Sequence, residues 1–250
     1  MSNSQLLVFD DPVSLSRAAA EYVSALTREP IADGHPFTLA VSGGRTPERL
    51  YRLLGQPPYS LTIPWTRLHI FWGDERCVPP DHAESNYRQA HELWLENVPL
   101  PPANIHRIQG ELGAAAAARE YATTLQEFAR ATLADPQQRW PRFDLALLGL
   151  GDDGHVASLF PGVIPASGQP VLAITADYQD RPAERVTLAP AVFNSARTIL
   201  FLVTGETKAE ALAAIRQGKP DPTRWPASRI QPEDGFVLWM VDRAAAHKLK

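Results

Sequence analysis

Short apolar runs alternate along the chain with longer segments in which apolar residues recur with helical period. Runs rich in Val, Ile, Leu and Phe predict seven strands, at 37–41, 68–72, 143–149, 171–175, 185–188, 199–204 and 236–241. Several are apolar on both faces, as the strands of a buried parallel sheet are. The periodic segments predict five helices, at 12–28, 46–54, 85–96, 112–134 and 206–217.

This alternation predicts an α/β fold in which helices cover a mostly parallel sheet. Proline and glycine cluster in the connections at 55–59, 99–104, 161–170 and 218–226, and none of these connections is long enough to separate two domains. The sequence shows no internal repeat. We therefore expect a single domain spanning residues 1–250.

Composition narrows the class of protein. With 44% hydrophobic and 21% charged residues, the chain can build a sizeable core, which excludes disordered and fibrous proteins. The formal net charge of -4 gives no general attraction to nucleic acid or to a membrane surface. Positive charge that meets an anionic ligand must therefore be placed locally.

Cysteine usage and hydropathy bear on the compartment. Cys77 is the single cysteine, so no internal disulfide can form. The N-terminal stretch lacks a basic segment followed by an apolar run, and no apolar segment approaches the roughly 18 residues of a membrane span. We expect a cytosolic protein.

In open parallel sheets, ligands bind beyond the carboxyl ends of the strands, so functional residues are expected in the loops that follow strands. The first such loop, 39–51, holds Ser42, Gly43 and Gly44, followed by Thr46 and Pro47 as an expected N-cap and first helical position. Backbone amides of such a turn bind phosphate, aided by the Ser42 hydroxyl. The alternative is an ordinary strand-to-helix turn.

The second loop, 71–87, places Asp74, Glu75 and Arg76 directly after a hydrophobic strand. Arg76 can bind phosphate or carboxylate oxygens with its two-pronged guanidinium, and an acidic neighbour can orient it. For a charge triplet alone, a solvated salt-bridge cluster is the better reading. Ser85 and Asn86 are expected to cap the next helix, with side chains that can also face the site.

The third loop, 147–162, is the most informative. His155 follows Asp152 and Asp153 in a turn rich in glycine, where the backbone can approach a ligand closely. Asp153 can select the tautomer of His155, which makes this histidine a candidate general base. Two alternatives are a structural histidine and a metal site formed with both aspartates, although no metal-binding spacing accompanies them. Farther on, Lys208 begins a helix after a strand and can reach the same crevice.

Taken together, the segments SGGRTP, GDERCVPPDHAESNY, GLGDDGHVASLFPG and GETK closely resemble the 6-phosphogluconolactonases of the pentose phosphate pathway, in the right order over nearly the whole chain. The related glucosamine-6-phosphate deaminases share the GxDGH core, but AFNEP typically follows their histidine. Here Phe160 stands where that segment has its glutamate, and DER replaces a DEY-like segment. Both differences favour the lactonase.

The resemblance implies a modified Rossmann-like α/β fold, with a mostly parallel sheet flanked by helices on both faces. It implies His155 as the general base and Asp153 as its orienting partner. Substrate-binding residues would come from the same motifs: Ser42, Gly43, Gly44, Arg45, Asp74, Arg76, Ser85, Asn86, Gly154 and Lys208. The phosphate would be held by the SGG turn and Lys208, whereas Arg76 would bind either the phosphate or the lactone end.

The expected reaction is hydrolysis of 6-phospho-D-glucono-1,5-lactone to 6-phospho-D-gluconate, with no metal and no cofactor. Cys77 as a nucleophile is a weaker alternative, because a single cysteine after a strand is more often a small buried side chain. Two rival functions are an amino-sugar phosphate deaminase or isomerase and a non-catalytic sugar-phosphate sensor. Apart from the small phosphorylated lactone, we expect no nucleic-acid or membrane partner, and a monomer or weak homodimer.

Overall fold

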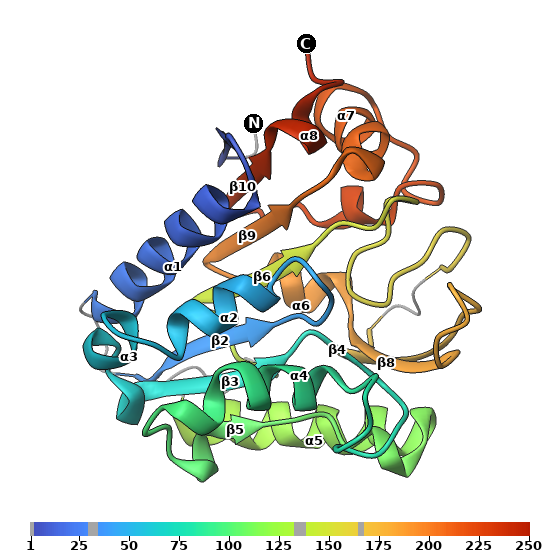
Figure 1. Ribbon diagram of the computed structural model, residues 1–250. Helices are drawn as coiled ribbons and strands as arrows, with labels where there is room; N and C mark the ends of the chain where they lie inside the picture. The colour runs from blue at the N-terminus through green and yellow to red at the C-terminus, as the bar shows by residue number, and fades with distance from the viewer. Residues whose placement is uncertain (1–2, 30–34, 133–138, 165–167) are drawn as a thin grey trace.

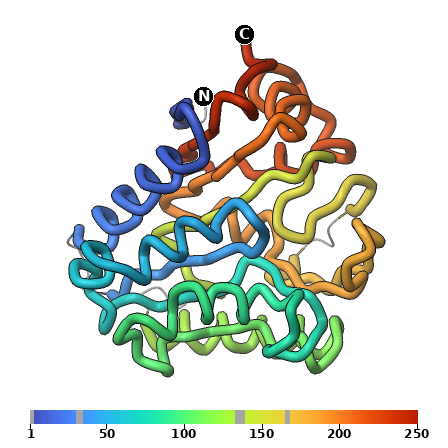
Figure 2. The backbone as a smooth tube through the Cα atoms, viewed as in Figure 1, coloured from blue at the N-terminus to red at the C-terminus, as the bar shows by residue number. Residues whose placement is uncertain are grey.

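The computed structural model describes residues 3–29, 35–132, 139–164 and 168–250, and its ribbon and backbone trace are shown in Figures 1 and 2. Helices surround a twisted central sheet. The helices are α1 (Pro12–Arg28), α2 (Glu48–Leu54), α3 (Tyr59–Thr62), α4 (Asn86–Leu93), α5 (Ala114–Thr132), α6 (Pro190–Asn194), α7 (Ala209–Gln217) and α8 (Arg243–Ala246).

The described residues form a central sheet of seven parallel strands in the order β1-β10-β9-β6-β2-β3-β5. These strands are β1 (Asn3–Phe9), β2 (Phe37–Val41), β3 (Leu68–Trp72), β5 (Ile105–His106), β6 (Leu145–Gly149), β9 (Thr198–Val203) and β10 (Phe236–Asp242). Helices α1 and α2 pack against each other over the near face in Figure 1. The predicted α/β fold, with a mostly parallel sheet flanked by helices, is confirmed.

A second sheet has three antiparallel strands in the order β4-β8-β7. They are β4 (Asp74–Arg76), β7 (Val171–Thr175) and β8 (Glu184–Leu188). The segments 171–175 and 185–188 were expected in the parallel sheet, and this placement was wrong. Parallel neighbours need a long crossover, usually a helix, whereas a short connection joins β7 to β8 as a hairpin. Gly73 joins the two sheets, accepting from Leu188 N–H and donating to the Val41 carbonyl, both at 2.8 Å.

Most predicted elements match the observed ones to within two residues, but several ends differ. Helix α2 begins at Glu48 after Pro47 without a side-chain cap, so the predicted Thr46 cap is wrong. Thr46 Oγ1 instead lies 3.2 Å from Thr204 Oγ1. Helix α4 ends at Leu93, and a separate 3-10 turn, Leu95–Asn97, follows it. The predicted helix end at Ala134 lies outside the described residues.

The parallel register brings the important loops to one edge of the sheet. Ala40 of β2 is opposite Phe71 of β3 and Ala146 of β6, and Leu202 of β9 is opposite Gly149 at the end of β6. The carboxyl ends of β2, β3, β6 and β9 therefore lie in line, and the loops after them share one edge. None of the helices in the described ranges has the length and apolar character needed to cross a membrane.

Candidate active site

His155 is held by Asp153 two residues earlier. The Nδ1 atom of His155 lies 2.6 Å from Asp153 Oδ1, and the same oxygen accepts the His155 backbone N–H at 3.0 Å. Burial opposes ionisation of Asp153, but the bonds from His155 prevail and keep the pKa of this carboxyl below its ordinary value. An ionised carboxylate only accepts, so Nδ1 carries the proton and Nε2 presents a lone pair. This is the arrangement of a general base.

The glycines of this turn leave room for its neighbours. A side chain at Gly151 would overlap the His155 ring, and the Gly151 N–H donates to the His155 carbonyl at 2.8 Å. Gly154 has φ +81, a conformation that side chains rarely adopt, and its α-carbon faces the ring of Trp225. The absence of a side chain at Gly154 therefore lets the turn pack closely against Trp225.

Two aromatic rings enclose the His155 imidazole. Phe160 lies 4.8 Å from it between ring centres at a tilt of 34°, and Tyr178 lies 4.9 Å away at 74°, edge to face. Only 18% of the His155 side chain is exposed. Phe160, which stands where a deaminase has glutamate, thus packs directly on the histidine.

Lys208 ends the 3-10 turn Glu206–Lys208 and directly precedes α7, after β9. Burial lowers the pKa of its ammonium, while Asp152 and Asp153 oppose that shift and Arg45 adds to it. Two cations, Lys208 and Arg45, therefore repel each other near the aspartates of the histidine turn. An anion between them would relieve this repulsion.

The DER triplet is buried. Asp74, Glu75 and Arg76 form β4 and are 6%, 2% and 8% exposed, so the solvated salt-bridge cluster is wrong for this segment. Glu75 accepts the backbone N–H groups of Arg76, Asn86 and Tyr87 at 2.7–2.8 Å and the Ser85 hydroxyl at 3.0 Å. Burial raises its pKa to about 7 although these four donors oppose the shift. Glu75 thus ties the start of α4 to β4.

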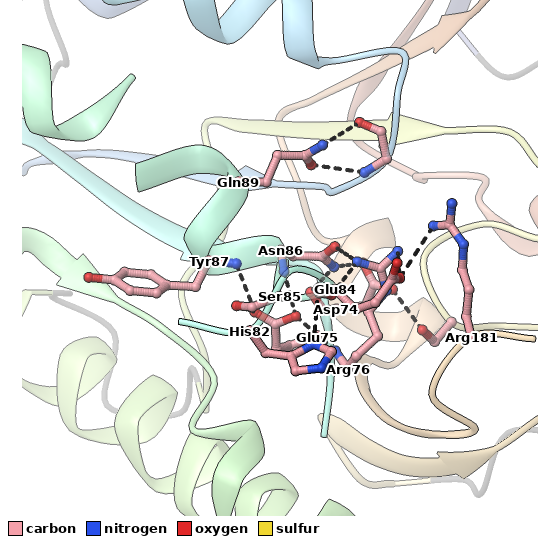
Figure 3. A network of polar contacts seen from close by, with 12 residues as sticks. Asp74, Glu75, Arg76, His82, Glu84, Ser85, Asn86, Tyr87, Gln89 and Arg181 are labelled. Atoms are coloured by element: carbon pink, nitrogen blue, oxygen red, sulfur yellow. Dashed lines mark hydrogen bonds and ion pairs between the residues drawn. The ribbon is translucent and has the colours of Figure 1, made fainter. Parts of the chain in front are cut away.

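Asn86 lies between Asp74 and Arg76 (Figure 3). Its Oδ1 accepts from Arg76 Nη1 at 2.5 Å, and its Nδ2 donates to the Asp74 carbonyl at 2.8 Å. Asp74 Oδ2 accepts from the Ser158 hydroxyl at 2.6 Å, which links β4 to the histidine loop. Ser85 caps α4 as predicted, accepting from the Arg88 N–H at 3.2 Å. The structure brings Asp74, Arg76, Ser85 and Asn86 together.

Arg76 and Arg185 are cross-strand neighbours in the antiparallel sheet. Arg185 is 4% exposed, and within the described residues its Nε and Nη2 atoms have no hydrogen-bond partner. Burial lowers the pKa of its guanidinium; Asp74 opposes this shift, and Arg76 adds to it. Like charges directly opposite in a sheet destabilise it, and buried donors without acceptors add to the cost. An anion beside the two guanidinium groups would lower both costs.

The turn after β2 is shaped by α4. The Ser42 hydroxyl donates to the Leu147 carbonyl, and Gln89 bonds both the N–H and the carbonyl of Gly44 at 3.0 Å (Figure 3). A side chain at Gly43 would overlap the Asn86 amide. Two donors expected to bind phosphate are therefore engaged within the fold, and Gln89 is a site residue that the sequence did not reveal.

The chemical alternatives find little support in the geometry. Burial, reinforced by Glu184 and Glu75, raises the pKa of Cys77 to about 11, which disfavours a nucleophilic thiolate. Within the described ranges, no three His, Cys, Asp or Glu side chains are grouped as metal ligands would be. The Asp152 and His155 side chains instead bond Tyr178 and Asp153.

Residues 10–239 match the family model described as "Glucosamine-6-phosphate isomerases/6-phosphogluconolactonase". The chain belongs to this family. A 6-phosphogluconolactonase of Synechocystis is 38% identical over 245 residues, covering 98% of this chain and 97% of that protein. These matches confirm the resemblance inferred from the motifs.

Solved structures of this superfamily agree. The Trypanosoma brucei 6-phosphogluconolactonase superposes with a TM-score of 0.83 at 26% identity, covering 100% of both chains. A monomeric glucosamine-6-phosphate deaminase of the NagB superfamily gives 0.81 at 21% identity, covering 98% of this chain and 99% of that one. The second likeness shows that lactonase and deaminase share the fold, so the site must distinguish them.

Three further side chains of this family member escaped the sequence reasoning: Glu75 as the anchor of α4, Arg185 and Tyr178. Arg185 had a readable signal, because an arginine inside a buried strand needs a partner or a ligand. Tyr178 had none, since it lies in a polar connection and its contacts with Asp152 and His155 arise only from the folded hairpin.

Proposed function

We propose that this protein hydrolyses 6-phospho-D-glucono-1,5-lactone to 6-phospho-D-gluconate, the second step of the oxidative pentose phosphate pathway. The observation that carries the proposal is His155, held at Nδ1 by Asp153 with Nε2 left to accept a proton. The Synechocystis relative named 6-phosphogluconolactonase, alike over nearly its whole length, supports the same assignment.

A lactone carbonyl is already electrophilic, so hydrolysis needs an activated water and a proton for the leaving ring oxygen. Neutral His155 removes a proton from water as the water attacks C1, and the Asp153 carboxylate stabilises the imidazolium. The tetrahedral intermediate then expels the ring oxygen at C5, which takes the proton back from His155. The histidine returns to its starting form, and the product is the open-chain acid.

Substrate binding is proposed from the cations around this base. Lys208 and Arg45 hold the phosphate, because an anion between them relieves their mutual repulsion. The turn after β2 contributes through Gly43, because Gln89 already bonds the N–H of Gly44. Arg76 and Arg185 add positive charge on the β4–β8 side. Asn86 fixes Arg76 and is itself held by Asp74, and Ser85 caps the helix that carries Asn86. Ser42 and Gly154 shape the two turns.

His155→Ala tests the proposal. Loss of freshly made 6-phosphogluconolactone is followed after subtracting the spontaneous rate, and the variant should lose about 10²–10⁴-fold in kcat because a positioned base contributes that much. It should still bind 6-phosphogluconate. His247→Ala, at an exposed histidine after α8, is the matched control. Lys208→Ala should mainly raise KM.

The rival functions give different results in the same experiment. A deaminase would release ammonia from glucosamine 6-phosphate, and Phe160 at the glutamate position argues against this. A sensor would bind 6-phosphogluconate without turnover. A wild-type rate equal to the spontaneous rate would refute the lactonase.

We also propose a cytosolic protein that forms one domain over residues 1–250 and is a monomer or weak homodimer, working without metal or cofactor. One continuous hydrophobic cluster, which extends from Leu15 to Ala245, supports the single domain. The single, half-buried cysteine fits a reducing compartment. Gel filtration at several concentrations tests the oligomeric state, and activity in a chelator tests the metal.

A further inference from the structure

The hairpin between β7 and β8 reaches the site from the second sheet. Its tip is a tight turn in which the Arg181 N–H bonds the Tyr178 carbonyl at 3.1 Å, with Gln179 and Asp180 between them at φ 52 and 54. Positive φ at both central residues gives the twist that suits a two-residue hairpin. Tyr178 and Arg181 therefore face each other where the hairpin ends.

The two residues anchor the tip to two different loops of the site. The Tyr178 hydroxyl donates to Asp152 Oδ1 at 2.8 Å, in the histidine loop. Arg181 Nη1 lies 3.8 Å from Glu84 Oε2, and Arg76 Nη2 lies 3.9 Å from the same oxygen (Figure 3). One is thus the loop after β6, and the other is the loop after β4.

Tyr178 contacts both parts of the proposed machinery. Its ring meets the His155 imidazole in a T-shaped arrangement at 4.9 Å between centres, and it also packs on Phe160 at 5.4 Å. The hydrogen bond from Tyr178 is the main cause that lowers the pKa of Asp152, and Lys208 lowers it further. Asp152 is therefore held ionised between the phenol and the ammonium.

We propose that Tyr178 is a positioning residue for the lactonase site, with two separable actions. Its hydroxyl fixes the Asp152 carboxylate, whose negative charge stabilises the Lys208 ammonium, and its ring shields one side of His155 from water. The first action serves substrate binding through Lys208, and the second serves the base. Tyr178 itself needs no contact with the reacting atoms.

Two substitutions separate these actions. Tyr178→Phe removes only the hydroxyl, so KM for the lactone should rise about three- to tenfold while kcat stays within about twofold, as expected for one lost hydrogen bond to a charged group. Tyr178→Ala also removes the ring, so kcat should fall by about tenfold.

The kinetic part of this inference rests on the proposed function. A measurement on the free protein, without substrate, distinguishes a failure of the inference from a failure of that function. The imidazole NMR signals of His155, assigned by their loss in His155→Ala, are recorded in the free protein at one fixed pH. They should shift in Tyr178→Ala, because the aromatic ring 4.9 Å from the imidazole is removed, and stay in place in Tyr59→Phe, a matched change on α3. This result is expected whatever reaction the protein catalyses.

Arg181→Gln provides a second route to the same answer if Tyr178→Ala fails to fold. It removes the other anchor of the tip without altering Tyr178, and it should raise KM in the same direction as Tyr178→Phe. Arg67→Gln, at an exposed arginine just before β3 and thus at the opposite end of the sheet, controls for net charge. Unchanged KM and kcat, with the His155 signals in their wild-type positions, in the folded Tyr178 variants would overturn the proposal.

Discussion

The α-carbon of Gly43 lies against the side-chain amide of Asn86, where a methyl group would overlap it. Asn86 in turn accepts from Arg76 at 2.5 Å. Gly43→Ala should therefore displace Asn86 and remove one of the acceptors of the buried Arg76 guanidinium, which costs about 1.5–3 kcal/mol. The expected result is a fall in kcat/KM of about tenfold or more, measured by the lactone assay.

A double-mutant cycle tests whether the effect passes through Asn86. If it does, Gly43→Ala combined with Asn86→Ala should be no worse than the more impaired single variant, because the same contact is lost in each. Strictly additive losses would contradict this path and point to a direct role of the Gly43 backbone.

At the scale of single residues, the sequence predicts contacts between residues that lie close together along the chain. Asp153 and His155 are two apart in a glycine-rich turn, so their pairing could be inferred. Gln89 on Gly44 depends on how α4 packs beside the turn after β2, which no local pattern records. The Arg76–Arg185 opposition arises similarly from the antiparallel register of two distant strands.

Among the elements, the edge pair β3 and β5 carries a stacked pair of histidines. His69 Nδ1 lies 3.0 Å from His106 Nε2, and Phe71 stacks on His106 at 4.3 Å. Burial lowers the pKa of both rings, and for His106, with His69 beside it, from 6.5 to about 4. The folded state therefore favours the neutral form of both imidazole rings over the charged form.

A pH-dependent stability follows from this pair. Because the folded pKa values lie below the unfolded ones, the contribution is complete above about pH 6.5 and is lost as the pH falls towards 4. The free energy of unfolding from urea titrations should fall over that range, by on the order of 2 kcal/mol from this pair. In the double variant His69→Leu/His106→Leu, the free energy of unfolding should depend less on pH than in wild type. The control His247→Leu should keep the wild-type dependence.

The sequence predicted the long elements because their apolar periods are strong, as in α1, whose bounds match the expectation. Strand β4 was missed, since the three charged residues Asp74–Arg76 do not read as a strand. It exists because β8 supplies hydrogen bonds, and because Ser158, Ser85 and Asn86 bond the side chains of its three residues. Tertiary contacts outweigh local propensity there.

On the scale of the whole molecule, the order of strands could not be predicted, because pairing joins segments far apart in the chain. Strand β10 lies between β9 and β1 and so ties the end of the described chain to its beginning. Trp239 of β10 is 3% exposed and stacks on Phe201 of β9 at 3.9 Å with an interplanar angle of 4°.

Trp239→Ala should therefore weaken the fold well beyond its own strand. We expect a loss of about 3–5 kcal/mol in the free energy of unfolding, as for other buried aromatic truncations. Hydrogen exchange of the β1 amides should accelerate as well, since β10 is their partner. Leu61→Ala, at a side chain that is 79% exposed, is the control and should change stability by less than about 0.5 kcal/mol. If the β1 amides of the Trp239→Ala variant exchanged as slowly as in wild type, the stability of β1 would not depend on the packing of β10.

The pairing of β1 with β10 has a consequence during synthesis. A ribosome releases β1 long before β10, and β10 is the only strand with which β1 pairs in the described residues. The nascent chain must carry Leu6 and Leu7 uncovered while the rest of the sheet assembles. Shielding of these two leucines by β10 is thus delayed until residues 236–242 have been synthesised, and a chaperone that binds exposed apolar segments can protect them in this interval.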